Sequence, residues 1–285
     1  MQYPEIISIP NNPALRGQAG VVPDVVYSTA TGQDLTLTLL MPWAVEGAPL
    51  PRRPLIVFVQ GSGWTSPDIQ YQLPQLARYA QFGHIVATVT HRDSTQGHAF
   101  PAYLQDVKTA IRFLRHNADT WGIDPERICL FGTSSGGNIA LLAGLTADDP
   151  RYKTDEYADQ SDRVRCVISC FGPANLNTLI AGHEQEFSQN PVYTGLLGGW
   201  QLEDVLRGMS PQLEIVPGKA CPPILLAHGD RDELVPFAQS EAMYHALLDA
   251  GCRAQLIRVI GAGHEGSFWS NRLHGLFADF MREHL

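Results

Sequence analysis

A short glycine-rich stretch decides the fold of this chain: residues 132–137 read GTSSGG. An apolar run typical of a buried strand, residues 128–131, comes directly before it, and a helical stretch at 138–145 follows. The stretch fits the pattern G-x-S-x-G with Ser134 at its centre. Such a serine lies on a sharp strand-to-helix turn with its hydroxyl exposed, and the flanking glycines avoid a Cβ clash. Ser134 is therefore a candidate nucleophile, and its other interpretation is a serine that only caps the helix.

Strand-like and helical stretches alternate along the rest of the chain. One run alternates as a half-exposed strand does, and five continuous apolar runs are typical of buried parallel strands, at residues 35–39, then 55–59, 85–89, 164–171, 224–227 and 255–260. Helical patterns lie between them, at 103–114, at 238–250 before Gly251, and at 273–280. This order predicts a single α/β domain over residues 1–285, with a doubly wound, mostly parallel sheet and helices on both faces.

One segment interrupts this alternation. Residues 175–220 contain no clear strand, and Gly195, Gly198 and Gly199 break their pattern. About 45 residues are too many for a plain connection, and long loops in compact domains are usually functional. We expect a cap over the active site in which Trp200 helps to bind substrate. The alternatives are an irregular surface excursion for the segment and a packing role for Trp200.

The composition is that of an ordinary globular protein with a sizeable core: 285 residues, 44% hydrophobic and 17% charged. These values exclude collagen-like, disordered and coiled-coil chains. The net charge is −9, and no cluster of Lys or Arg is visible in the sequence. Nucleic acids, anionic membrane surfaces and polyanionic substrates are therefore disfavoured as partners. The negative net charge is compatible with a neutral substrate. Its alternative interpretation is that the charge only keeps the protein soluble.

The sequence predicts a cytoplasmic protein. No apolar run approaches the ~18 residues of a membrane span, and the first residues lack the basic and apolar regions of a secretory signal. The chain has five cysteines. Cys166 and Cys170 lie four apart in a strand-like run, so about 13 Å separates them, too far for a disulfide. We expect all five to be reduced thiols, and none has the spacing of a zinc site.

A serine nucleophile needs a base, and the base needs a carboxylate that orients it. After a turn of this kind both partners follow the serine along the chain. Of the ten histidines, only His264 follows a strand within a glycine-bounded loop, residues 261–266. The loop after residues 224–227 contains three candidates for the orienting acid, Asp230, Asp232 and Glu233. The residues alone do not favour one of them over the others.

The strand at 55–59 leads into a second glycine-containing loop, in which residues 60–64 read QGSGW. Small residues allow backbone N–H groups to approach the oxyanion that forms when a carbonyl is attacked. The predicted donors are the amides of Ser62, Gly63 and Ser135. Trp64 offers a flat apolar wall for an aromatic acyl group, and a core-packing role is its alternative.

These motifs resemble the α/β-hydrolase carboxylesterases related to hormone-sensitive lipase, and most closely the bifunctional acetylxylan esterase/feruloyl esterase-like branch. The similar stretches run from Pro54 to the C-terminus and include WGIDPERI at 121–128, LLGG at 196–199 and PPILL at 222–226. The resemblance implies the α/β-hydrolase fold. In that family the carboxylate is the fourth residue after the histidine of a His-Gly pair, here His228, which favours Asp232 over Asp230.

Two stretches depart from the family pattern. The oxyanion loop is usually HGGGW, whereas Gln60 and Ser62 replace two of its residues here, and the elbow is usually GDSAGG, whereas Thr133 and Ser135 stand here. Neither change removes a catalytic atom. We expect them to affect which acyl group fits.

The resemblance and the candidate triad together predict a serine carboxylesterase for small neutral esters of acetyl or hydroxycinnamoyl (feruloyl) type, including esters on plant-derived sugars. The mechanism needs no metal and no organic cofactor, and a small-molecule ester is the expected partner. Two alternatives remain open: a peptidase or amidase of prolyl-oligopeptidase type on the same triad, and a non-catalytic binding protein on the fold. The oligomeric state is not predicted.

Overall fold

The computed structural model describes residues 6–285, except for the side chains of residues 184, 188, 192 and 193. Its strands are β1 (Ala19–Ser28), β2 (Leu35–Pro42), β3 (Arg53–Val59), β4 (Ile85–Val89), β5 (Ile123–Thr133), β6 (Cys166–Cys170), β7 (Ile224–Gly229) and β8 (Ala254–Val259). Its α-helices are α1 (Leu73–Gln81), α2 (Ala102–His116), α3 (Ala118–Trp121), α4 (Ser135–Leu145), α5 (Leu176–Leu179), α6 (Glu184–Gln189), α7 (Pro191–Leu197), α8 (Leu202–Gly208), α9 (Ala238–Asp249) and α10 (Asn271–His284). Short 3-10 helices are η1 (Ser94–Gln96), η2 (Pro150–Tyr152), η3 (Pro211–Glu214) and η4 (Gly266–Phe268).

The strands of the described residues form one sheet in the order β1-β2-β4-β3-β5-β6-β7-β8. The pairs β1–β2 and β2–β4 are antiparallel, and every pair from β4–β3 onward is parallel. Parallel neighbours end at the same edge of the sheet. The loops that follow β3, β5, β7 and β8 therefore open side by side, although they are far apart in the sequence.

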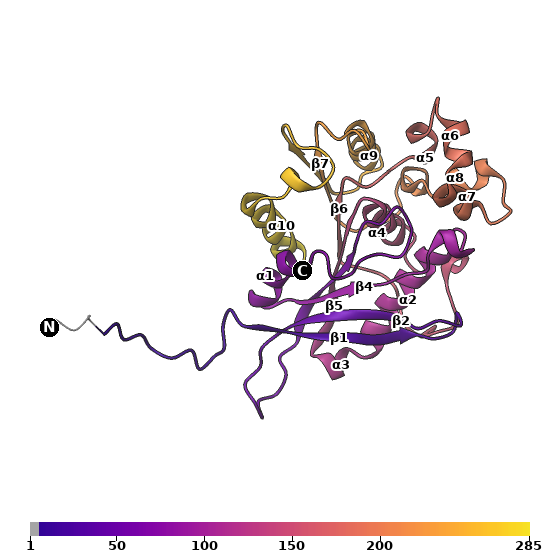
Figure 1. Cartoon of the computed structure of the whole chain (residues 1–285). Coiled ribbons are helices and arrows are strands. Elements are labelled where there is room, and N and C mark those ends of the chain that lie inside the picture. Colours follow the sequence, from indigo (N-terminus) through magenta and orange to yellow (C-terminus); the bar gives the residue numbers. More distant parts are fainter. Residues whose placement is uncertain (1–5) are drawn as a thin grey trace.

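Helices cover both faces of the sheet, as Figure 1 shows. On one face, Leu76 of α1 and Phe277 of α10 belong to a buried cluster with Phe131 of β5. On the other face, Val107 of α2 and Leu141 of α4 belong to a second, larger cluster. The predicted mostly parallel sheet with helices on both faces is confirmed. Within residues 6–285, no helix is long and apolar enough to span a membrane.

Strand β1 lies outside the runs expected from the sequence. Pro23 and Asp24 interrupt its apolar pattern, and its pairing with β2 shifts register between Val22 and Val25. Edge strands tolerate proline and bulges because one side of the strand has no ladder to complete. The proline and the register shift are therefore compatible with an edge strand. They also break the apolar alternation from which strands are predicted, so β1 was not expected.

Residues 175–220 form a helical insert made of α5 to α8 and η3, with no strand among its described residues. Leu196, Val205 and Met209 are buried in the cluster that also holds α4. The helices lie together as one group at an end of the molecule (Figure 1), and the amide of Phe100 donates to the carbonyl of Leu196 at 3.2 Å. The insert is thus anchored in the core, which an irregular surface excursion would not be.

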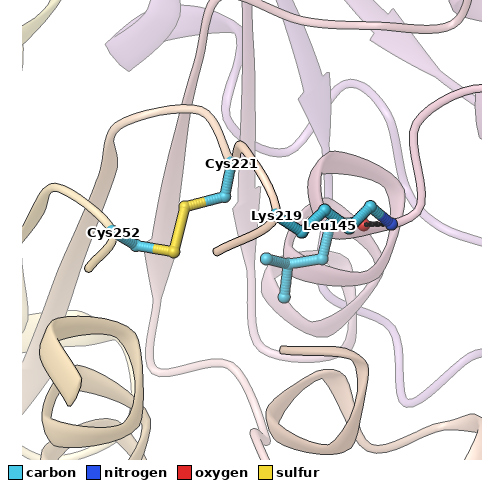
Figure 2. Close-up of a disulfide and its surroundings, with 4 residues drawn as sticks. All are labelled: Leu145, Lys219, Cys221 and Cys252. Carbon is cyan, nitrogen blue, oxygen red and sulfur yellow. Dashed lines mark hydrogen bonds between the residues drawn. A yellow bond between two sulfur atoms is a disulfide. The ribbon is translucent and has the colours of Figure 1, made fainter. Parts of the chain in front are cut away.

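The expectation of five reduced cysteines is wrong. Cys221 and Cys252 form a disulfide with a Cα–Cα distance of 6.0 Å, whereas Cys129, Cys166 and Cys170 are free and buried. Figure 2 shows the bridge between the two segments that lead into β7 and β8. The two cysteines meet because Ile224 pairs with Ala254, so residues just before each strand start side by side. The cytoplasmic location expected from reduced thiols loses that support.

Candidate active site

Ser134 lies between β5 and α4 on a strained turn. Its backbone has φ 51° and ψ −124°, a conformation that non-glycine residues rarely adopt. Its amide donates to the carbonyl of Cys170 at 2.9 Å, and its own carbonyl accepts from Asn138 at 3.0 Å. A Cβ at Gly132 would lie 2.0 Å from the carbonyl oxygen of Gly136, so this close turn requires glycine. The elbow geometry expected from the sequence is present.

His264 lies in the loop after β8 and bridges the other two candidate residues. Its Nε2 accepts a hydrogen bond from Ser134 Oγ at 3.0 Å, and its Nδ1 donates to Asp232 Oδ2 at 2.7 Å. The ring of Phe171, at the end of β6, lies 4.5 Å from the imidazole between centroids. Parallel pairing of β5, β6, β7 and β8 thus brings together three groups that lie up to 130 residues apart in the sequence.

The acid loop places Asp232, rather than Asp230 or Glu233, against the histidine. Asp232 is buried, and its Oδ1 accepts the amides of Leu234 and Val235 at 2.9 and 2.8 Å, which fixes the carboxylate plane. Asp230 instead accepts from the Gly261 amide and from Arg258. Glu233 is exposed.

The charge of Asp232 is strongly stabilised. Burial acts to raise the pKa of this carboxyl, but hydrogen bonds from His228 and His264 outweigh it and hold the pKa well below its usual range. Asp232 is therefore ionised at neutral pH. A fixed carboxylate can keep the imidazole in one tautomer and stabilise the imidazolium that forms when the histidine takes a proton.

His228 is a positioning residue whose contact with the acid the sequence did not reveal. Its side chain is fully buried. Its Nε2 lies 3.2 Å from Asp232 Oδ2 and 2.8 Å from the carbonyl of Val235, so Nε2 carries the proton. Its Nδ1 accepts from the hydroxyl of Ser240 at 2.7 Å. The signal for this role was the His-Gly pair four residues before the acid.

The oxyanion loop lies directly against the elbow. A Cβ at Gly61 would lie 2.7 Å from the Cβ of Ser134. The amide of Gly61 donates to Thr133 Oγ1 at 2.9 Å, and the amide of Ser62 donates to Ser135 Oγ at 2.9 Å. Thr133 and Ser135, the two departures at the elbow, therefore hold the loop through their hydroxyls.

Of the three predicted oxyanion donors, two have free amides. The N–H groups of Gly63 and Ser135 have no acceptor within the described residues, whereas that of Ser62 already donates to the Ser135 hydroxyl. The Ser135 amide also belongs to the first turn of α4, where backbone N–H groups carry partial positive charge. Ser62 could contribute only by exchanging its present acceptor.

A pocket of about 350 Å³ opens at Ser134 and His264. Its other walls come from residues 60–63, Asp68, Tyr71 and Glu265. Gln60 is buried, and its Oε1 has no hydrogen-bond partner among the described residues. The lining side chains are mostly of polar types, but the surface they present is more apolar than polar, so the pocket suits a small ester.

Neither predicted substrate-binding tryptophan lines this pocket. Trp64 is 3% exposed and packs in the core beside Tyr103, where its Nε1 donates to Asn138 at 3.3 Å. Trp200 is 65% exposed in the insert. No described residue of 175–220 contributes to the wall of this pocket, and a cap role for the insert stays a prediction.

Glu265 is a pocket residue that the sequence analysis left unassigned. It follows His264, has φ 71°, and its carboxylate accepts from Trp269 Nε1 at 2.6 Å. Burial raises the pKa of Glu265 above its ordinary value, although the Trp269 hydrogen bond and the His264 charge act to lower it. Residues 6–285 contain no cluster of three His, Cys, Asp or Glu able to hold a metal ion.

Comparison with known families gives a match over most of the chain. The model of a family described as BD-FAE matches residues 46–247. The esterase LipC of Mycobacterium tuberculosis is 30% identical over 232 residues, which are 79% of this chain and 56% of LipC. The chain thus spans a little more than half the length of the curated relatives it matches.

Solved structures share the fold over nearly the whole chain. A bifunctional GH43-CE protein of Bacteroides eggerthii has a TM-score of 0.79 at 28% identity, covering 92% of this chain and 38% of that one. A truncated carbohydrate esterase from the gut microbiota has a TM-score of 0.75 at 26% identity, covering 96% of this chain and 99% of that one. These likenesses agree with the α/β-hydrolase fold expected from the sequence.

Proposed function

The chain belongs to the BD-FAE family, and from this premise and the geometry at Ser134 we propose that it is a serine carboxylesterase for small neutral esters. The observation that carries the proposal is the hydrogen-bonded series from Ser134 through His264 to Asp232, with distances of 3.0 and 2.7 Å. A serine hydroxyl is a weak nucleophile alone, and this arrangement is the one that activates it.

The proposed reaction has two halves. Ser134 Oγ attacks the ester carbonyl while His264 Nε2 takes its proton, and Asp232 stabilises the imidazolium. His264 then gives the proton to the leaving alcohol, and an acyl group remains on Ser134. Water, deprotonated by His264, attacks the acyl-enzyme and releases the acid. The side chains supply every proton transfer, so the steps require no metal or organic cofactor.

The oxyanion of each tetrahedral intermediate would be held by the amides of Gly63 and Ser135. Each missing donor of this kind costs roughly 3 kcal/mol in transition-state stabilisation. The amide of Ser62 becomes a third donor only if it leaves the hydroxyl of Ser135, to which it donates at 2.9 Å. The two free amides are therefore the donors we assign to the hole.

The proposed substrates are acetyl and hydroxycinnamoyl esters, with a carbohydrate as the alcohol. One similar structure is named as a bifunctional GH43-CE protein and another as a carbohydrate esterase, and the pocket of about 350 Å³ suits a small acyl group. Tyr71, which is 59% exposed at this pocket, is the aromatic side chain available to contact a cinnamoyl ring. Trp64 is buried and does not serve this purpose.

The test is a competition among p-nitrophenyl acetate, methyl ferulate, a long-chain p-nitrophenyl ester and an aminoacyl p-nitroanilide. We expect turnover of the first two and little of the others. Ser134→Ala should lower ester turnover by about 10⁵-fold or more with an unchanged melting temperature. Preference for the anilide would favour the peptidase alternative, and preference for the long chain would contradict the substrate class. No turnover of any ester would overturn the proposal.

A further inference from the structure

A second groove lies at the edge of the sheet opposite to Ser134. It has a volume of about 1000 Å³, and its walls come from the segments that lead into β6, β7 and β8 and from the last residues of α2, α4 and α10. β8 has six residues, so about 20 Å separates its two ends. The groove is therefore distinct from the pocket that contains the candidate triad.

The groove is rich in cations although the protein is acidic. Five of the 20 Lys and Arg residues of the chain line it against two glutamates, while the net charge of the whole chain is −9. The five cations come from different parts of the sequence and are Arg115, Arg163, Arg165, Lys219 and Arg253. Only the fold gathers them, which is why no basic cluster is visible in the sequence.

Neutral carbonyl groups hold most of these cations in place. Arg115 donates to three backbone carbonyls, Arg165 Nε donates to the carbonyl of His284 at 3.2 Å, and Lys219 Nζ donates to that of Leu145 at 3.2 Å. Within the described residues, none of these three cations forms an ion pair within 4.0 Å. Neutral groups therefore fix their positions, and no carboxylate of the described residues lies within ion-pair distance of them.

The disulfide adds a clamp at one end of the groove. Lys219 lies two residues before Cys221, and Arg253 directly follows Cys252, so the bridge with its 6.0 Å Cα–Cα distance ties together the two segments that carry these cations. Figure 2 shows the bridge and the hydrogen bond from Lys219 to Leu145. Arg253 is exposed and also has no ion pair in residues 6–285.

Of the 15 Lys and Arg residues outside the groove, eight form an ion pair with a carboxylate of the described residues. Arg92, Arg151 and Arg258 each form an ion pair with a carboxylate at 2.8 to 3.0 Å. In the groove only Arg163 has an acidic partner, at 3.5 Å, and the two lining glutamates are exposed. Ion pairing is thus less frequent in the groove, where one cation of five has a partner, which favours a ligand that supplies negative charge.

We propose that this groove binds a small organic polyanion with two or more carboxylate or phosphate groups. Guanidinium and ammonium groups from several segments match such groups through charge-assisted hydrogen bonds. The volume is that of an ordinary small-molecule site. A long polyanion is disfavoured because the net negative charge of the protein repels the parts that extend beyond the groove.

The test is calorimetric titration of the whole protein with sodium tripolyphosphate and, separately, with citrate, at low ionic strength. We expect saturable binding of one molecule per chain, with the tighter probe indicating whether the natural ligand carries phosphate or carboxylate groups. Lys219→Gln and Arg253→Gln should each weaken binding about three- to fivefold, and the double variant about tenfold or more. The matched control is Arg272→Gln, which removes one exposed charge at the start of α10, outside the groove.

Two outcomes would overturn this proposal. One is the absence of saturable binding of both probes to the unmodified protein. The other is an equal loss of affinity in Arg272→Gln, which would show that only total charge matters. Neither readout uses ester turnover, so the result is independent of the proposed function at Ser134.

Discussion

Strands β7 and β8 carry different chemistry at their two ends. At the carboxyl ends, Asp232 and His264 are joined by a hydrogen bond of 2.7 Å, and each polar group has a specific side-chain partner. At the amino ends, Lys219 and Arg253 flank a disulfide and have no carboxylate partner among the described residues. The same strand pairing thus assembles both regions. We propose that side chains with specific partners make a reacting site at one end, while cations without ion-pair partners make a binding site at the other.

The largest expected effect lies at the carboxyl end. Asp232→Asn should lower kcat/KM for p-nitrophenyl acetate by about 10⁴-fold, because the amide favours the wrong imidazole tautomer. Asp230→Asn should lower it by less than about tenfold, since Asp230 contacts Gly261 and Arg258 rather than His264. Steady-state kinetics of both variants measure the difference. The reverse order would show that the acid is misassigned.

The disulfide should matter for stability and not for turnover. Replacing Cys221 and Cys252 together by serine should lower the free energy of unfolding by about 2–4 kcal/mol, since the bridge closes a 31-residue separation. The value of kcat should change by less than about twofold. Urea unfolding and ester kinetics of the variant measure the two quantities. As a control, reduction of the disulfide in the unmodified protein should give the same loss of unfolding free energy. A large fall in kcat would contradict this prediction and would mean that the amino and carboxyl ends of β7 and β8 are coupled.

The two elbow hydroxyls should act in opposite directions. Thr133→Val should lower kcat/KM about tenfold, because it leaves the Gly61 amide without an acceptor and loosens the oxyanion loop. Ser135→Ala should raise kcat/KM about threefold, because it frees the Ser62 amide for the oxyanion. Steady-state ester kinetics of the two variants measure the two effects. Melting temperatures of both variants check that neither change unfolds the protein. A loss in Ser135→Ala would mean that holding the loop outweighs the extra donor.

The smallest effect concerns acid stability at a histidine outside both regions. Burial lowers the pKa of His274 to about 4, and the Arg78 charge acts in the same direction. Because the folded protein holds this group neutral, its contribution to stability is complete above about pH 6.5 and is lost as the pH falls toward 4. Between pH 7.5 and pH 4.5, the free energy of unfolding measured by urea titration should fall by about 1 kcal/mol more in the unmodified protein than in His274→Gln. Equal losses would contradict this account.

Much of the reacting end could be predicted from local sequence. The elbow around Ser134 was visible because an apolar strand, a glycine-flanked serine and a helix must follow one another within a few residues. His264 was visible because its loop is bounded by glycines after a strand. The choice among Asp230, Asp232 and Glu233 needed the family register. In the structure that choice depends on the backbone path, which aims Asp232 at the histidine through the amides of Leu234 and Val235.

The sequence by itself determined most of the alternation of strands and helices, except for β1 and α1, together with the strand-turn-helix at Ser134 and the position of His264, because these depend on residues that are close in the chain. Only the tertiary structure decided which distant residues meet. Parallel pairing of β7 and β8 joined Cys221 to Cys252 and gathered the cations of the second groove. The packing of α2 and α4 buried Trp64, and the anchoring of the insert left Trp200 exposed and away from the pocket. Such contacts arise from the course of the whole chain in space, which short-range patterns do not encode.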